Sequence, residues 1–364
     1  MDSDQTSNKN KRLLIDTDIH NGIEASELLP YLSGYWHEWV KTRGLGATSA
    51  FYTSPIGVMR NDAIPPKGGA AGSDPQFLVE HHIEKNGIDF GILTGSGILT
   101  ISLQPDVDWA NAVVSAYNEV TKTKWLDADS RFRGSILINH SDPQFSAQEI
   151  DRVATDKRFV QVVMTSASPR LYGNRFFHPI YEAAARNGLP VAVHPGGETG
   201  GISGAPTPSG YPSRYMEWHN ILPTNYMAHV NSLVCEGVFE KFPNLKFVAI
   251  EGGIAWLPHL MWRMDKNYKA LRSTTPWLKK LPSEYIREHV RLTTQPIEEP
   301  DNHEHLLQIF EMIDAKNTVM FSSDYPHWDY DNPKMALPPL RGELKEGIMW
   351  RNAAKLYNLG EYAK

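Results

Sequence analysis

Short apolar runs rich in β-branched residues alternate along the chain with longer stretches that repeat apolar residues at helical spacing. The runs cover residues 13–18, 88–94, 134–139, 159–165, 189–194, 245–251, 290–294 and 318–323. The helical stretches cover residues 74–85, 109–122, 147–154, 176–187, 226–242, 254–271, 303–313 and 340–357. Strands that are apolar throughout and separated by helices are typical of a parallel sheet covered by helices. Eight such units predict an α/β fold, a (β/α)₈ barrel.

Two long segments rich in glycine and proline interrupt this alternation, and both follow the end of a predicted strand. We interpret residues 44–73 and 196–220 as insertion loops on the face where barrels build their active sites. Residues 1–11 are predicted to be a disordered tail, and residues 12–364 a single barrel domain. A doubly wound open sheet is the alternative, but no G-x-G-x-x-G follows the first run.

Ionisable side chains stand directly after several of the predicted strands. Alternate residues of a strand share a face, so Asp16, Asp18 and His20 are expected to point the same way. Burying several such groups around one axis costs several kcal/mol apiece unless a cation is present. A metal site at the mouth of the barrel is therefore predicted. The other strand ends supply Asn139, His140, His194, Glu251, Asp324 and His327.

Composition narrows the class of protein further. The chain has 364 residues, a hydrophobic fraction of 41%, a net charge of -6 and a pI of about 6.2. It lacks the clusters of lysine and arginine expected of a protein that binds nucleic acid or a membrane surface, and neither partner is predicted. No run approaches the length of a membrane span, and the first dozen residues lack a secretion signal. We therefore expect a cytoplasmic enzyme that acts on a small molecule.

Three longer stretches carry a resemblance to a known family. They are GVFEKFPNLKFVAIEGGIAWLPHLMWRMDKNY at 237–268, LTTQPIEEP at 292–300 and FSSDYPHWDYDNP at 321–333. Residues 12–360 resemble the amidohydrolase superfamily, in particular its amidohydrolase 2 branch. The resemblance implies a (β/α)₈ barrel of the metal-dependent hydrolase type. It also implies that the chain is an oligomer, either of identical chains or with a related chain.

The resemblance also implies a set of metal ligands. The first-strand pair of the family falls on Asp18 and His20, its fifth-strand histidine on His194, and its eighth-strand carboxylate on Asp324. Asp18 stands where most members have histidine. Glu251 is expected to complete the set, and it stands where decarboxylating relatives carry a catalytic histidine.

The carboxylate-rich ligand set favours manganese or iron more than an all-histidine site would, and zinc remains an alternative. The pattern D-x-D-x-H is similar to that of members that include a di-iron thioesterase and a manganese/iron hydroxylase of 2-aminoisobutyrate. This likeness implies one or two ions per chain. Glu251 or His229 would then supply ligands to a second ion.

Several residues are predicted to take part in the chemistry. Asp324 would accept the proton of a metal-bound water, and His229 and His327 would carry protons or stabilise an oxyanion. Both histidines are open to a packing role instead. The loop that ends in His219 would bind the substrate and hold its carboxylate through Arg214, although a surface salt bridge explains that arginine equally well.

Three classes of function are open at this point. The first is a hydrolase of an amide, ester or thioester of a small carboxylic acid. The second is a dinuclear iron or manganese/iron oxygenase that hydroxylates a small amino acid such as 2-aminoisobutyrate. The third is a subunit of a complex with a paralogous chain, whose own site is mainly structural. Decarboxylation is ranked below hydrolysis and oxygenation, because Glu251 replaces the usual histidine.

Overall fold

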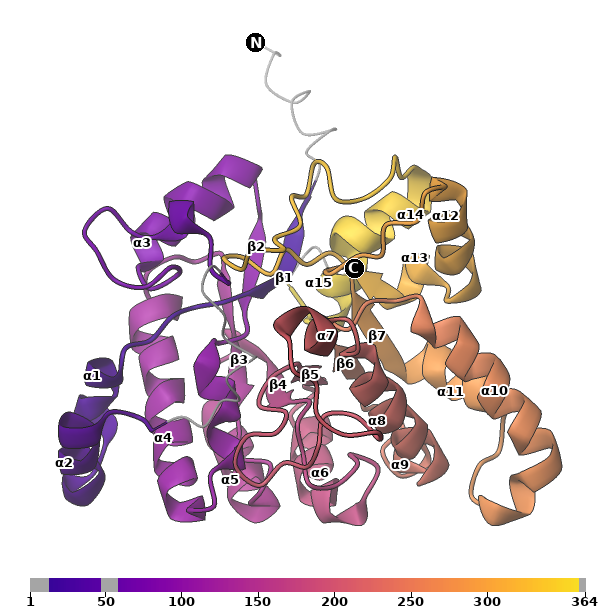
Figure 1. The fold of residues 1–364 in the computed structure, drawn as a ribbon, viewed down its shortest axis with the longest axis horizontal. Helices are drawn as coiled ribbons and strands as arrows, with labels where there is room; N and C mark the ends of the chain where they lie inside the picture. The colour runs from indigo at the N-terminus through magenta and orange to yellow at the C-terminus, as the bar shows by residue number, and fades with distance from the viewer. Residues whose placement is uncertain (1–12, 47–57, 360–364) are drawn as a thin grey trace, which may run out of the picture.

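The computed structural model describes residues 13–46 and 58–359, and within them eight parallel strands pair in sequence order. Figure 1 shows helices around the outside of these strands. The strands are β1 (Ile15–Ile19), β2 (Phe90–Leu93), β3 (Phe132–Leu137), β4 (Phe159–Thr165), β5 (Val191–His194), β6 (Phe247–Ala249), β7 (Val290–Thr293) and β8 (Val319–Met320).

Contacts between β1 and the segment around β8 bring the two edges of the sheet together. The backbone N–H of Thr17 donates to the carbonyl of Phe321 at 3.0 Å, and that of His20 donates to the carbonyl of Tyr325 at 2.8 Å. Ile19 also forms an isolated parallel bridge with Tyr325. The sheet is thus a nearly closed barrel, and the predicted (β/α)₈ fold is confirmed.

The helices connect successive strands, and several begin at an aspartate that caps them. Asp74, Asp106 and Asp142 each accept a hydrogen bond from a backbone N–H in the first turn. The helices are α1 (Ala25–Leu28), α2 (Gly34–Arg43), α3 (Pro75–Leu78), α4 (Val107–Val120), α5 (Pro143–Val153), α6 (His178–Arg186), α7 (Tyr215–His219), α8 (Pro223–Cys235), α9 (Val238–Lys241), α10 (Trp256–Leu271), α11 (Pro282–His289), α12 (His303–Met312), α13 (Ala315–Thr318), α14 (Gly342–Glu346) and α15 (Asn352–Leu356).

The helix predicted at 226–242 is divided in two. Gly237 separates α8 from α9 and has a φ of 71°, a left-handed conformation that glycine adopts at little cost. Helices α1, α2, α7, α11 and α13 lie outside the predicted helical stretches. Among the described residues, none of the helices is both long and apolar enough to cross a membrane.

The predicted tail, residues 1–11, lies outside the described residues, as do residues 47–57 of the predicted insertion 44–73. The described part of this insertion includes a 3₁₀ turn at Asn61–Ala63. Helix α7 lies within the second predicted insertion, 196–220. Both segments follow the C-terminal end of a strand, β1 and β5 respectively.

Apolar side chains fill the interior of the barrel near the N-terminal ends of its strands. They pack against the C-terminal segment that contains α15, which lies beside β1 and β8. The buried residues of this cluster are Ile15, Ile92, Val160, Ala192, Val248, Ile250, Met320, Ala353, Ala354, Tyr357 and Leu359. This end of the barrel is therefore sealed, and polar chemistry is left to the opposite end.

One buried polar contact ties the C-terminal segment to the interior. The hydroxyl of Tyr357 donates to Gln161 Oε1 at 2.9 Å, and Gln161 Nε2 donates to Ser135 Oγ at 2.9 Å. We predict that Tyr357→Phe lowers the free energy of unfolding by about 1–3 kcal/mol, because Gln161 Oε1 loses its partner without access to water. Urea denaturation measures the change. The exposed Tyr211 offers a control, since Tyr211→Phe should change stability by less than about 0.5 kcal/mol. Equal effects of the two substitutions would contradict the prediction.

Candidate metal centre

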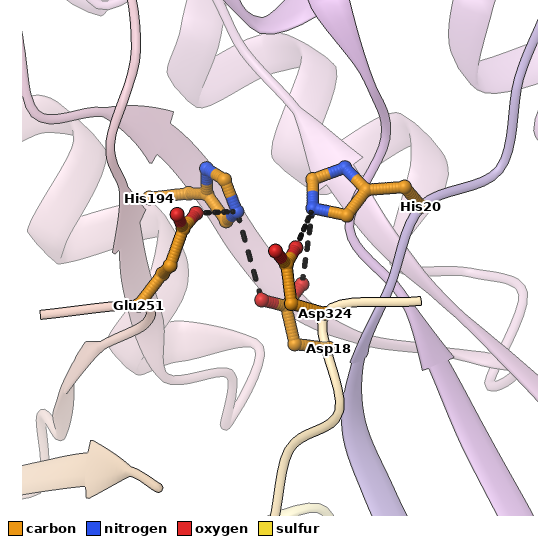
Figure 2. Close-up of side chains that lie close together, drawn as sticks. All are labelled: Asp18, His20, His194, Glu251 and Asp324. Atoms are coloured by element: carbon orange, nitrogen blue, oxygen red, sulfur yellow. Dashed lines mark ion pairs between the residues drawn. The ribbon is translucent and has the colours of Figure 1, made fainter. Parts of the chain in front are cut away.

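Five side chains that can bind a metal converge at the C-terminal ends of the strands. Asp18 and His20 come from β1 and the residue after it, and His194 is the last residue of β5. Glu251 and Asp324 follow β6 and β8. Each of the five offers one ligand atom, and all of these atoms lie within 4.8 Å of one another. Figure 2 shows the side chains pointing toward a common centre.

The backbone is strained at two of these residues. Glu251 has a φ of 55° and Asp324 a φ of 58°, and both are left-handed conformations that residues other than glycine rarely adopt. Such a conformation costs about 1–3 kcal/mol and persists where the surrounding structure enforces it, which occurs most often at functional sites. The chain thus turns sharply after β6 and β8 and aims both carboxylates into the barrel mouth.

Backbone carbonyls fix the protonation of the two imidazoles. His20 Nδ1 lies 2.5 Å from the carbonyl oxygen of Gly95, and His194 Nδ1 lies 2.8 Å from that of Pro195. Because a carbonyl oxygen can only accept a hydrogen bond, each Nδ1 carries the proton. In the neutral ring Nε2 then presents its lone pair to the centre. This is the usual arrangement of a histidine that binds a metal.

Three of the atoms that face the centre have close neighbours but no hydrogen bonds. His20 Nε2 lies 2.7 Å from Asp324 Oδ1, and His194 Nε2 lies 3.0 Å from Glu251 Oε2 and 3.6 Å from Asp18 Oδ2. Neither Nε2 nor Asp18 Oδ2 has a hydrogen-bond partner among the described residues. Asp18 Oδ1, in contrast, accepts a hydrogen bond from Thr94 Oγ1 at 2.5 Å. Lone pairs that point at one shared space fit a divalent metal ion.

The pKa values of the cluster reflect this crowding of charge. Burial opposes ionisation of Asp18, but His194 and His20 hold its pKa below the usual value. Burial also lowers the pKa of His194, yet the carboxylates of Asp18 and Glu251 raise it well above its usual range. For Asp324, burial prevails and the pKa is raised. Without a cation, a proton on His194 therefore balances part of the negative charge of the cluster.

A second group of ionisable residues borders the first. His219 Nε2 lies 3.3 Å from Asp329 Oδ2 and 3.6 Å from Glu251 Oε1. Burial lowers the pKa of His219, but these two carboxylates raise it to about 10. His327 Nδ1 lies 2.7 Å from Asp324 Oδ1, and this contact similarly raises the pKa of His327 to about 9 against the effect of burial. Both imidazoles are therefore protonated at neutral pH.

Beside the five-residue cluster lies a cavity of about 280 Å³. Aromatic and aliphatic side chains form much of its wall, and it opens onto the metal-facing atoms. Its lining includes Val58, Met59, Leu99, Tyr215, Trp218, His20, His194, Glu251, Asp324, His327 and Asp329. Asp329, Tyr215 and Trp218 were not predicted as site residues. Asp329 lies in the 321–333 stretch that carries the family resemblance, and this stretch was the one sign in the sequence that could have indicated Asp329 as a site residue.

Other candidate residues lie away from this centre. His229 accepts a hydrogen bond at Nδ1 from the backbone N–H of Tyr172 at 3.2 Å, and its Nε2 donates to the carbonyl of Ser166 at 2.8 Å. Arg214 is exposed just before α7 and is not among the residues that line the 280 Å³ cavity. The predicted contact of Arg214 with a substrate carboxylate stays a prediction.

Asp16 does not join Asp18 and His20, although strict alternation places all three on one face. The pairing of β1 with β2 shifts register between Asp16 and Ile19. Asp16 instead accepts hydrogen bonds from the backbone N–H of Ser323 at 2.9 Å and from the Ser323 hydroxyl at 2.5 Å, and it lies 2.8 Å from His82 Nε2. It holds the segment after β8 against β1.

The fold and the cluster together define the class of this protein: a (β/α)₈ barrel with a candidate divalent-metal centre at the C-terminal ends of its strands. Residues 64–359 match the family described as Amidohydrolase, and the chain belongs to that family. The predicted amidohydrolase 2 branch is confirmed. The closer likeness to D-x-D-x-H members stays a prediction.

Three relatives illustrate what the chain is similar to. Gamma-resorcylate decarboxylase of Rhodococcus jostii is 24% identical over 270 residues, which cover 69% of this chain and 75% of that protein. The structure of 5-carboxyvanillate decarboxylase from Sphingomonas paucimobilis has a TM-score of 0.68 and 24% identity, covering 96% of this chain and 99% of that one. A third structure is that of dihydroxybenzoic acid decarboxylase from Polaromonas with bound manganese and the inhibitor 2-nitroresorcinol. It has a TM-score of 0.66 and 20% identity, and the match covers 96% of this chain and 98% of that one.

These relatives correct the expected function. The prediction of a hydrolase, with an amino-acid oxygenase as its alternative, is wrong, because the relatives are named as decarboxylases. Decarboxylation was ranked lower because Glu251 replaces a histidine. That ranking assumed that the imidazole must come from the end of β6, whereas His219 of α7 lies 3.6 Å from Glu251.

The metal centre can be tested with two aspartates of the same strand. We predict that Asp18→Asn weakens the binding of Mn²⁺ by more than about 100-fold, the upper end of what loss of an outer-shell partner costs. Asp16→Asn should retain the metal, because Asp16 contacts Ser323 and His82 rather than the centre. Isothermal titration calorimetry measures the affinities, and circular dichroism checks that both variants fold. Metal binding by Asp18→Asn at the wild-type affinity would refute the assignment.

Proposed function

We propose that this protein is a divalent-metal-dependent decarboxylase of a small aromatic carboxylic acid. The observation that carries the proposal is the cluster of two imidazoles and three carboxylates whose lone pairs face one space beside a cavity with aromatic walls. Relatives of the same fold are named as decarboxylases of hydroxybenzoate-type acids, and one is described with bound manganese. We propose manganese as the ion, held by Asp18, His20, His194, Glu251 and Asp324.

The cavity suits a ring with a carboxylate at one end. Its volume of about 280 Å³ is at the small end of the range for ligand pockets, which suits a single substituted ring. Tyr215, Trp218 and Leu99 offer contacts to the faces of such a ring. No lysine or arginine is among the described lining residues, so the substrate's negative charge would face the metal side of the cavity. A bound divalent ion would supply the positive charge that holds the carboxylate and an adjacent oxygen.

Asp324 is our candidate for the proton donor. It lies at the cavity, with His327 Nδ1 2.7 Å from its Oδ1. In the proposed step, a proton moves from Asp324 to the ring carbon that bears the carboxylate. The bond between that carbon and the carboxylate then breaks, its electron pair restores the aromatic ring, and CO₂ leaves. His327 would return a proton to Asp324 for the next turnover.

His219, which lies beside Glu251, would supply the imidazole that decarboxylating relatives are expected to carry at the end of β6. His219 Nε2 lies 3.6 Å from Glu251 Oε1, and its pKa of about 10 keeps the ring charged at neutral pH. We propose that the charged ring holds the carboxylates of Glu251 and Asp329 in place, both of which line the cavity. The carboxylate of Glu251 then serves the metal and His219 at once. His229 is proposed as a packing residue, because both of its ring nitrogens are bonded to backbone.

Activity toward a panel of mono- and dihydroxybenzoates tests the proposal. We expect Mn²⁺-loaded protein to release CO₂ from at least one of them with one equivalent of the decarboxylated phenol, and chelation of the metal to abolish the reaction. In D₂O the product should carry one deuterium at the carbon that lost the carboxylate. Chromatography and mass spectrometry measure these products. The proposal fails if fully metal-loaded protein decarboxylates none of the panel.

A substitution of the proposed acid tests its role separately. We predict that Asp324→Asn lowers kcat by about 10²–10⁴-fold, because the amide cannot donate a carboxylic proton. Metal content is measured on the same sample, and rates are compared per bound ion. The control is Asp331→Asn. Asp331 lies in the same loop, and its side chain accepts a hydrogen bond from the backbone N–H of Ile297, so this variant should keep most of the activity. An Asp324→Asn variant as active per ion as wild type would exclude Asp324 as the acid.

A further inference from the structure

A second cavity, of about 260 Å³, lies next to the metal centre and has no part in the proposed reaction. Successive residues of the segment after β5 line the two cavities. Gly196 and Gly197 border the cavity of the metal centre, whereas Glu198 and the stretch from Ser203 to Pro208 border the second one. The remaining wall comes from the residues after β4 and from the first turns of α8.

A buried carboxylate with one unused oxygen lines this second cavity. The side chain of Glu198 is only 3% exposed. Its Oε1 accepts hydrogen bonds from Ser166 Oγ, from Asn225 Nδ2 at 3.1 Å and from the backbone N–H of Gly196 at 3.4 Å. Its Oε2 accepts no hydrogen bond from any described residue. A buried carboxylate oxygen without a donor costs free energy, and burial accordingly raises the pKa of Glu198. A ligand that brings both a donor and a positive charge would stabilise the ionised form.

The other polar groups of the cavity are mostly acceptors as well. The hydroxyl of Ser203 donates to the carbonyls of Gly197 and Gly200, that of Thr207 donates to Gly210, and that of Thr224 donates to Ile221. Because each of these hydrogens is already used, the hydroxyl oxygens have only lone pairs to offer a ligand. A ligand that fits must therefore bring several donors.

No residue of the described lining supplies positive charge to Glu198. The lining contains no lysine or arginine. His229 does line the cavity, but its Nδ1 is occupied by Tyr172 N–H and burial lowers its pKa to about 4, so its ring is neutral. Apolar groups, among them Ala205, Pro206 and Ala228, form the rest of the wall.

We propose that this cavity binds a small primary ammonium compound, with its –NH₃⁺ group on Glu198 Oε2 and its short alkyl part against the apolar wall. A primary ammonium has three donors and one positive charge, which matches one carboxylate oxygen surrounded by hydroxyl acceptors. The site is distinct from the proposed decarboxylation, and its test does not depend on that reaction.

One residue joins the two cavities. Ser166 donates its hydroxyl to Glu198, and its backbone N–H donates to the carbonyl of His194 at 2.7 Å. Ser166 thus contacts both the carboxylate that lines the second cavity and the backbone of a candidate metal ligand.

Calorimetric titration of the metal-loaded protein with ethylammonium chloride at constant ionic strength tests the site. We expect saturable binding of one ethylammonium per chain. Ethanol and potassium chloride, titrated in parallel, should bind at least about 10-fold more weakly, because ethanol lacks the charge and potassium lacks directed donors. Tight binding of potassium without ethylammonium, equal binding of ethanol, or no binding of ethylammonium would each overturn the proposal.

Two variants locate the bound cation. Glu198→Gln removes the charge but keeps an oxygen that can accept from Ser166 and Asn225, and it should weaken ethylammonium binding by about 10-fold or more. Ala228→Leu leaves the carboxylate in place but fills the cavity, and it should have a similar effect even if Glu198→Gln does not fold. Glu182→Gln, on the exposed face of α6, is the matched control and should bind as wild type. Unchanged affinity in Ala228→Leu would contradict the assignment to this cavity.

Discussion

Negative charge buried at the C-terminal mouth of the barrel is the constraint on which the site depends. Asp18, Glu251 and Asp324 are held within a few ångströms of one another, where water screens their repulsion poorly. Protons on the neighbouring histidines can balance this charge, but the tautomers set by Gly95 and Pro195 direct two lone pairs inward instead. A divalent cation would balance the carboxylates and bind the lone pairs of the neutral imidazoles together.

The rest of the barrel is built to hold these groups in place. β8 pairs over only Val319–Met320, and beyond it the chain leaves the sheet to present Asp324 in a left-handed conformation. Asp16 holds that segment in place, because its carboxylate accepts hydrogen bonds from both the backbone N–H and the hydroxyl of Ser323. The apolar plug around α15 seals the other end. Stability and chemistry are thus placed at opposite ends of one sheet, as is usual in this fold.

The sequence predicted the barrel because buried parallel strands leave a strong apolar signal, and the predicted run 159–165 coincides with β4. Residues at or just beyond the ends of such strands, such as His194 and Glu251, could be placed for the same reason. Asp16 could not, because a shift in register is invisible in the pattern of residues. His219 was predicted only as part of a substrate-binding loop, and its contacts with Glu251 and Asp329 could not be predicted, because sequence does not show which way such a segment turns its side chains.

The same limit explains why the function was misjudged. A glutamate at the end of β6 was taken as the loss of an imidazole, although an imidazole can be brought to the same place by another element of the fold. Helix α7 brings His219 to within 3.6 Å of Glu251, and Asp329 helps to keep that ring protonated. The segment that leads from β5 to α7 also forms the boundary with the second cavity through Glu198. This one segment therefore connects the candidate metal ligand His194, the acceptor-lined cavity and His219.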